Sequence, residues 1–117
     1  MAYMLLVVEP IDQRDERGEV AGRAVFDEMV RYRDSLNERG VLISAESLST
    51  AKKGKRLQVR EGKARLVDGP FAEAKEMIGG FFLVDCETQD EAVALAAECP
   101  AAQWSTIEVR KLGPCYE

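Results

Sequence analysis

Residues 66–86 read LVDGPFAEAKEMIGGFFLVDC, and the rest of the chain is organised around this stretch. The DGP run at 68–70 is typical of a chain reversal, because glycine admits backbone angles that other residues resist and proline fixes its own. A charged segment separates this turn from the FFLV run at 81–84, which is apolar on both faces, as an interior strand would be. We therefore expect a polar loop held between two rigid ends.

The composition sets limits on the kind of protein this is. Its 117 residues predict a single domain, residues 1–117. The net charge of −5 argues against a general affinity for nucleic acid, since phosphate backbones bind basic surfaces. No apolar run approaches the roughly 20 residues that cross a bilayer, so no membrane contact is expected and the predicted location is cytoplasmic.

The chain contains no histidine and three cysteines without a CxxC pair. The absence of histidine excludes Ser-His and Cys-His nucleophilic catalysis and histidine-based metal sites within one chain. The cysteines are interpreted as reduced thiols that pack as small apolar residues. We expect no metal and no cofactor.

Hydrophobic periodicity divides the chain into helices and strands. Helical spacing predicts a long helix over residues 19–39 and a second helix that starts at Thr88, where Thr88 and Glu91 match a capping box. Short apolar or alternating runs predict four strands, over residues 3–8, 41–49, 78–86 and 106–112. Alternation on either side of the REGK reversal at 60–63 predicts a half-exposed β-hairpin over residues 57–66. Residues 11–18 are charged and without a period, and we expect a mobile connection there.

This order predicts an α+β fold of the ferredoxin-like class, βαββαβ with an inserted β-hairpin. That topology places the first and third core strands at the centre of the sheet, where the two most apolar segments belong. Two helices cover only one face, yet both central strands are apolar on both faces. A second copy is the simplest cover, so we predict a homodimer through the open sheet face, in the form of a dimeric α+β barrel.

The central stretch resembles the signature of the DGPF-domain, YCII-related proteins of bacteria. The matching residues are the DGPFAE run at 68–73, Lys75-Glu76 and the IGGFF run at 78–82, and the two ends of the chain are similar as well. The resemblance implies a dimeric α+β barrel and little about activity, because the family is largely without an assigned reaction. Some members are encoded beside extracytoplasmic-function sigma factors, which implies a signalling context.

In the YCII proteins proper, the resemblance implies a His-Asp pair in a pocket, and some relatives perform dehydrochlorination. By position this pair corresponds to Met29 and Cys99 here, and neither side chain transfers protons as histidine and aspartate do. The resemblance therefore carries over only the DGPF loop, as the expected rim of a pocket.

The candidate site residues come from this loop and from the long helix. Asp68 and Glu73 are the candidate catalytic acid and base, because neighbouring buried carboxylates shift each other's pKa. The alternative is a turn-forming Asp68 in an exposed charged loop. The candidate ligand-binding residues, for which core packing or loop structure is the alternative, are Gly69, Pro70, Phe71, Lys75, Glu76, Met29 and Tyr32.

Three residues outside this set are weaker candidates. Glu9 ends the first strand and is a candidate member of the cleft. Trp104 is a candidate cover for the pocket mouth or for the dimer contact. Cys99 has no visible base to activate it as a nucleophile.

Three functions remain open at this point. The leading hypothesis is a homodimeric small-molecule-binding domain whose pocket is bordered by the loop Asp68–Glu76. The second is a cofactor-free enzyme that uses Asp68 and Glu73 on a small organic substrate. The third is an accessory protein in sigma-factor signalling.

Overall fold

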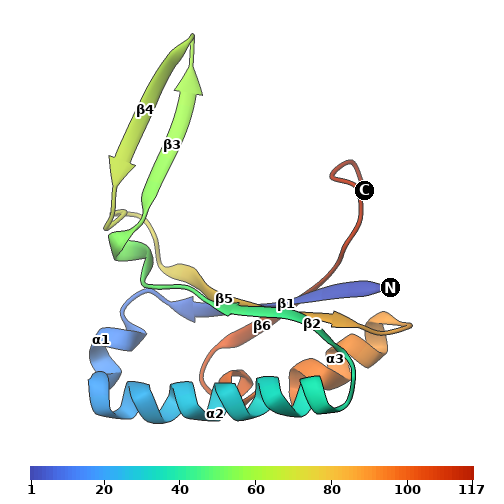
Figure 1. Cartoon of the computed structure of the whole chain (residues 1–117). Helices are drawn as coiled ribbons and strands as arrows, with labels where there is room; N and C mark the ends of the chain where they lie inside the picture. The colour runs from blue at the N-terminus through green and yellow to red at the C-terminus, as the bar shows by residue number, and fades with distance from the viewer.

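The computed structural model describes residues 1–117 and shows a four-stranded antiparallel sheet with its helices on one face (Figure 1). A separate two-stranded hairpin rises from the opposite side of the sheet, at the end where α1 lies. The elements are β1 (Ala2–Pro10), α1 (Gln13–Arg17), α2 (Glu19–Glu38), β2 (Leu42–Ser47), η1 (Ala51–Lys53), β3 (Lys55–Arg60), β4 (Lys63–Asp68), β5 (Glu76–Asp85), α3 (Gln89–Ala97), η2 (Pro100–Gln103) and β6 (Thr106–Lys111).

The strand order is β2-β5-β1-β6, so the two most apolar segments form the centre of the sheet. In the register, Leu5 of β1 lies opposite Phe82 of β5 on one side and Val109 of β6 on the other. The predicted α+β, ferredoxin-like βαββαβ topology with its inserted hairpin is thereby confirmed. None of the helices combines the length and the apolarity needed to cross a membrane.

The core lies between the sheet and the two longer helices. Alternate residues of β1 point into it, because successive side chains of a strand face opposite sides. Leu5, Leu36 of α2 and Val84 of β5 are fully buried there. The Tyr32 ring packs edge-on against Phe82, with 4.9 Å between ring centroids. The second half of α2 is thus fixed to the sheet.

The first half of α2 packs much less closely. Its apolar residues Val20 and Phe26 are 87% and 55% exposed, and the buried residues of the helix are Tyr32 and Leu36, both in its second half. The predicted stripe of apolar residues is therefore continuous in sequence but is buried only toward its C-terminal end.

The expected mobile connection at residues 11–18 is wrong, because α1 occupies most of it. The side-chain amide of Gln13 donates to the backbone oxygen of Trp104 (2.6 Å) and accepts from the Ser105 hydroxyl (3.0 Å). The ammonium group of Lys52 donates to Asp12 (2.7 Å) and Asp15 (2.6 Å), which raises the pKa of Lys52 and lowers that of Asp15. These partners lie far along the chain, and local periodicity cannot reveal them.

The hairpin β3–β4 forms at the predicted position. Its turn is Glu61-Gly62, with φ of 54° and 75°, the left-handed conformation that two-residue hairpin turns require. The expected half-exposed hairpin differs from the structure in one respect. All twelve residues of its two strands are exposed within one chain.

Candidate functional site

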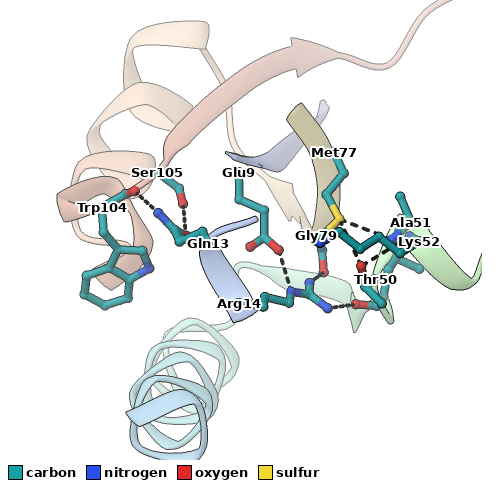
Figure 2. Close-up of polar contacts among 11 residues, drawn as sticks. Glu9, Gln13, Arg14, Thr50, Ala51, Lys52, Met77, Gly79, Trp104 and Ser105 are labelled. Atoms are coloured by element: carbon teal, nitrogen blue, oxygen red, sulfur yellow. Dashed lines mark hydrogen bonds and ion pairs between the residues drawn. The ribbon is translucent and has the colours of Figure 1, made fainter. Parts of the chain in front are cut away.

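The polar centre of the molecule is an ion pair at the end of β1, between a buried carboxylate and a half-buried arginine. Glu9 occupies the inward-facing register of Leu5 and Val7 and is only 7% exposed. Arg14 of α1 donates from Nε to Glu9 Oε1, from Nη1 to the backbone oxygen of Leu48 (2.8 Å) and from Nη2 to that of Gly79 (3.4 Å), as Figure 2 shows. A single guanidinium group therefore joins the end of β1, the segment after β2 and the start of β5.

The Gly79-Gly80 pair provides the space for this arrangement. A Cβ atom on Gly79 would lie 2.8 Å from Arg14 Nη2 and from Glu9 Oε2. A Cβ atom on Gly80 would lie 2.7 Å from the backbone oxygen of Glu46 in β2. The pairing of β1 with β5 shifts register at this point, between Val7 and Val8. The two glycines thus admit the ion pair on one side and the neighbouring strand on the other.

A cavity of about 880 Å³ opens beside the ion pair, between the first half of α2 and the sheet. Its size is within the range of small-molecule sites. Its apolar wall includes Val7, Val25, Phe26, Met29, Phe82 and Trp104. Its charged wall contains four arginines and four carboxylates, namely Arg14, Arg17, Arg23, Arg33, Glu9, Glu19, Asp27 and Glu46.

Arg17 is the arginine of this cavity that has no carboxylate partner. Arg14 pairs with Glu9, Arg23 with Glu19, and Arg33 with Asp34. The guanidinium carbon of Arg17 lies 5.7 Å from the centre of the Trp104 ring, a distance at which a cation and an aromatic face attract each other. Asp27 and Glu46 of the cavity wall also lack an ion-pair partner, but both are exposed, whereas Arg17 is half-buried. The cavity therefore offers one half-buried, unpaired positive charge beside an aromatic surface.

The DGPF loop lies elsewhere, at the base of the hairpin. Gly69 donates its N–H to the backbone oxygen of Gly54 (2.8 Å), and a Cβ atom there would lie 2.6 Å from the backbone oxygen of Ala51. The Arg56 guanidinium lies 3.9 Å from the centre of the Phe71 ring. These contacts attach the loop to η1 and to the start of β3. Within one chain, the motif therefore fixes the base of the hairpin.

The rest of the loop faces solvent or joins the sheet. Pro70 is exposed, and the backbone oxygen of Lys75 accepts from the N–H of Ile11 (2.9 Å). Glu76 is already the first residue of β5, opposite Pro10. No residue of Asp68–Glu76 is among those that line the cavity between α2 and the sheet.

The two candidate catalytic carboxylates are both exposed in the chain. Asp68 ends β4 and lies 3.4 Å from the Lys55 ammonium group across the hairpin. Glu73 lies in the turn after Phe71. The acid/base hypothesis requires a desolvated pair, and these positions do not provide one without a partner that covers them. Their catalytic role stays a prediction.

The two candidates from the helix have different positions. The Tyr32 hydroxyl donates to the backbone oxygen of Leu95 (2.6 Å), so Tyr32 is part of the core, and burial raises its pKa. Met29 lines the cavity, and its sulfur lies 3.9 Å from that of Cys99. The positions at which the resemblance placed a His-Asp pair are thus in contact, but here two sulfur-containing side chains occupy them.

Cys99 is expected to be unreactive in the folded protein. Burial raises the pKa of its thiol above the ordinary value of 9.0, so the nucleophilic thiolate is scarce at neutral pH. In native protein treated with a chromogenic disulfide reagent at pH 8, the exposed Cys115 should react first and Cys99 only at the rate of unfolding. Rapid modification of Cys99, read by peptide mass spectrometry, would contradict this.

Sequence reasoning placed Glu9 only loosely and missed Arg14 and Arg17. A signal for Glu9 was available, since residues 3, 5, 7 and 9 alternate inward and the last of them is the sole carboxylate in that series. The arginines gave no such signal, because they lie in a charged segment without a period.

The antiparallel sheet, the helices on one face and the cavity beneath them define a ferredoxin-like α+β domain. The chain belongs to the YCII-related domain family, whose model matches residues 1–115. It is also 47% identical over 53 residues to an uncharacterized protein of Rhizobium meliloti (strain 1021), a match that covers 44% of this chain. The matched part is 43% of that relative's length, less than half of it. The resemblance to the YCII-related proteins is therefore confirmed.

Proposed function

We propose that this protein is a homodimeric small-molecule-binding domain whose ligand is an organic anion with an apolar body. The observation that carries the proposal is the cavity between α2 and the sheet, in which the unpaired Arg17 lies beside Trp104. A carboxylate on the ligand would form an ion pair with Arg17. Its apolar part would lie against Phe26, Met29 and Phe82.

The charges in the interior of the cavity favour an anion over a cation or a neutral ligand, because the unpaired carboxylates Asp27 and Glu46 are exposed and Arg17 is half-buried. Glu9 is the one buried carboxylate of the cavity and is already held by Arg14, so it is not free to bind a cation. Charge-assisted bonds to arginine are also stronger than neutral hydrogen bonds and fix the orientation of a planar carboxylate.

Titration with 2-naphthoate, with 2-naphthamide as its neutral counterpart, tests this proposal. In ¹H–¹⁵N spectra the naphthoate should shift the amide signals of Gly18, Gly22 and Gly79, which line the cavity. Arg17→Gln should weaken its binding about tenfold, which corresponds to about 1.4 kcal/mol. Arg31→Gln is the matched control, because it removes the same charge from an exposed position of α2 outside the cavity.

Equal binding of the acid and the amide would contradict the ligand class. Shifts confined to the open sheet face would contradict the site.

The homodimer is proposed through the open sheet face, as the sequence predicted. Met4, Leu6, Val8 and Leu83 form an apolar centre on this face, and the helices lie on the other side of the sheet (Figure 1). A compact protein of 13.0 kDa exposes about 6,300 Å², whereas this chain exposes 8175 Å². The excess of about 1,800 Å² is in the range that each subunit of an obligate homodimer buries.

Sedimentation equilibrium tests the dimer directly. The wild-type protein should have the mass of two chains at micromolar concentration. Leu6→Asp should shift it to one chain, because a charge would then lie at the centre of the contact. A wild-type monomer would refute the dimer and leave the ligand proposal to be judged by the titration.

A further inference from the structure

The hairpin β3–β4 has two faces of opposite character. The register places Leu57 opposite Leu66 and Val59 opposite Ala64, so these four residues share one face. Arg56, Gln58 and Arg60 alternate with them and share the other face with Lys63 and Arg65. Such alternation of apolar and polar positions is typical of a strand pair with one buried face.

Nothing in the chain covers the apolar face. Leu57 is 64% exposed and Leu66 is 59% exposed. A two-stranded hairpin alone in water is marginally stable at best, so a well-formed one with an apolar face needs a covering surface. The radius of gyration is 16.0 Å, where a compact chain of this length has about 13 Å, and the projecting hairpin accounts for the extended shape (Figure 1).

The hairpin rises on the side of the open sheet face, where the proposed second copy would lie (Figure 1). Strands of six residues span about 20 Å, while two sheets packed face to face are about 10 Å apart. A hairpin of this length therefore extends past the partner's sheet and runs along its side.

The charges also favour a second copy over an unrelated partner. Lys55–Asp68 holds five basic and two acidic residues, a net charge of +3 in a chain of −5, so the remaining residues carry −8. Each copy thus has a basic hairpin and an acidic body. In a twofold dimer, the hairpin of each copy is attracted to the body of the other.

The base of the hairpin is fixed rather than loose. Gly69 approaches the Ala51 backbone closely, Arg56 stacks on Phe71, and Lys52 joins the same segment to Asp15 of α1. An arm with a fixed base loses little conformational freedom when it docks, which favours binding.

We propose that the β3–β4 hairpin is a dimer arm whose apolar face, Leu57, Val59, Ala64 and Leu66, lies against the side of a second copy. The inference rests on the proposed homodimer and adds a contact beside the one between the open sheet faces. The DGPF motif, in this arrangement, sets the direction of the arm.

Two substitutions at adjacent positions test the arm. Leu57→Asp and Gln58→Asp add the same charge to opposite faces of one strand. Measured by analytical ultracentrifugation, Leu57→Asp should raise the dimer dissociation constant at least about a hundredfold, because it would bury an unpaired carboxylate. Gln58→Asp should change it by no more than a few fold.

A second measurement does not depend on variants. In a dimer mixed from isotope-labelled and unlabelled chains, filtered NOE spectra should connect the methyl groups of Leu57 and Leu66 with methyl groups of the other copy. A wild-type dimer without these signals, or with equal dissociation constants for both variants, would overturn the arm and keep the homodimer. A wild-type monomer would overturn both the arm and the homodimer. If the NMR signals of the hairpin in that monomer shifted on addition of polyuridylate, its basic face would be assigned to nucleic-acid binding.

Discussion

Arg14→Met should lower the free energy of unfolding by about 3–5 kcal/mol, because it leaves the Glu9 carboxylate buried without its partner. The loss is large because Arg14 also binds two backbone oxygens, those of Leu48 and Gly79. Urea denaturation measures it at one fixed protein concentration, since the stability of the proposed dimer would depend on concentration.

Arg23→Met is the matched control for this change. Arg23 pairs with Glu19 one turn earlier in α2, where both side chains are largely exposed, and such pairs contribute about 0.3–0.5 kcal/mol. In the double variant Glu9→Gln, Arg14→Met, the uncompensated charge is absent and part of the stability should return. If Arg14→Met and Arg23→Met unfold at the same urea concentration, the Glu9–Arg14 ion pair does not stabilise the fold more than an exposed pair does.

Gly80→Ala should destabilise the protein by about 1–3 kcal/mol, in the range measured for overpacked sites. Its new Cβ atom would meet a backbone oxygen of β2 at 2.7 Å, and a hydrogen-bonded strand cannot move aside as a flexible side chain can. Hydrogen exchange should show the loss of protection concentrated in the pairing of β2 with β5.

Gly22→Ala provides the opposite result from the same chemical change. Gly22 lies within α2, and a Cβ atom there meets no atom within 4 Å. Alanine in a helix interior is favoured over glycine by about 0.5–1 kcal/mol, so this variant should be more stable than the wild type. A destabilised Gly22→Ala variant would indicate that the first half of α2 packs against something that the isolated chain lacks.

The fold was predictable because its determinants are local. Thr88 caps α3 by accepting from the N–H of Glu91 (3.2 Å), as the TQDE run at 88–91 indicated. The central position of β1 and β5 followed from their continuous apolar runs, at residues 3–8 and 80–84. Both inferences use neighbours within a few residues, and the sequence contains those directly.

The site was less predictable because its determinants are distant in sequence. Arg14 meets Gly79, 65 residues further along the chain, and Gln13 meets Trp104, 91 residues further along. The DGPF motif was interpreted as the rim of a pocket, whereas Gly69 and Phe71 hold the base of the hairpin in the chain. Turn-forming residues such as those of the DGP run indicate that the backbone geometry of a loop is constrained. They do not indicate which part of the chain the loop contacts.

The insertion point of the hairpin has a consequence for protein engineering. β2 ends at Ser47, directly opposite Gly80 of β5, so the chain leaves the sheet and returns to it at nearly the same place. Adding or deleting residues in pairs within the arm would leave the alternation of β1, β2, β5 and β6 untouched. If the proposed arm holds the dimer together, grafted arms of different length and charge would offer a way to choose which chains associate without changing the cavity between α2 and the sheet.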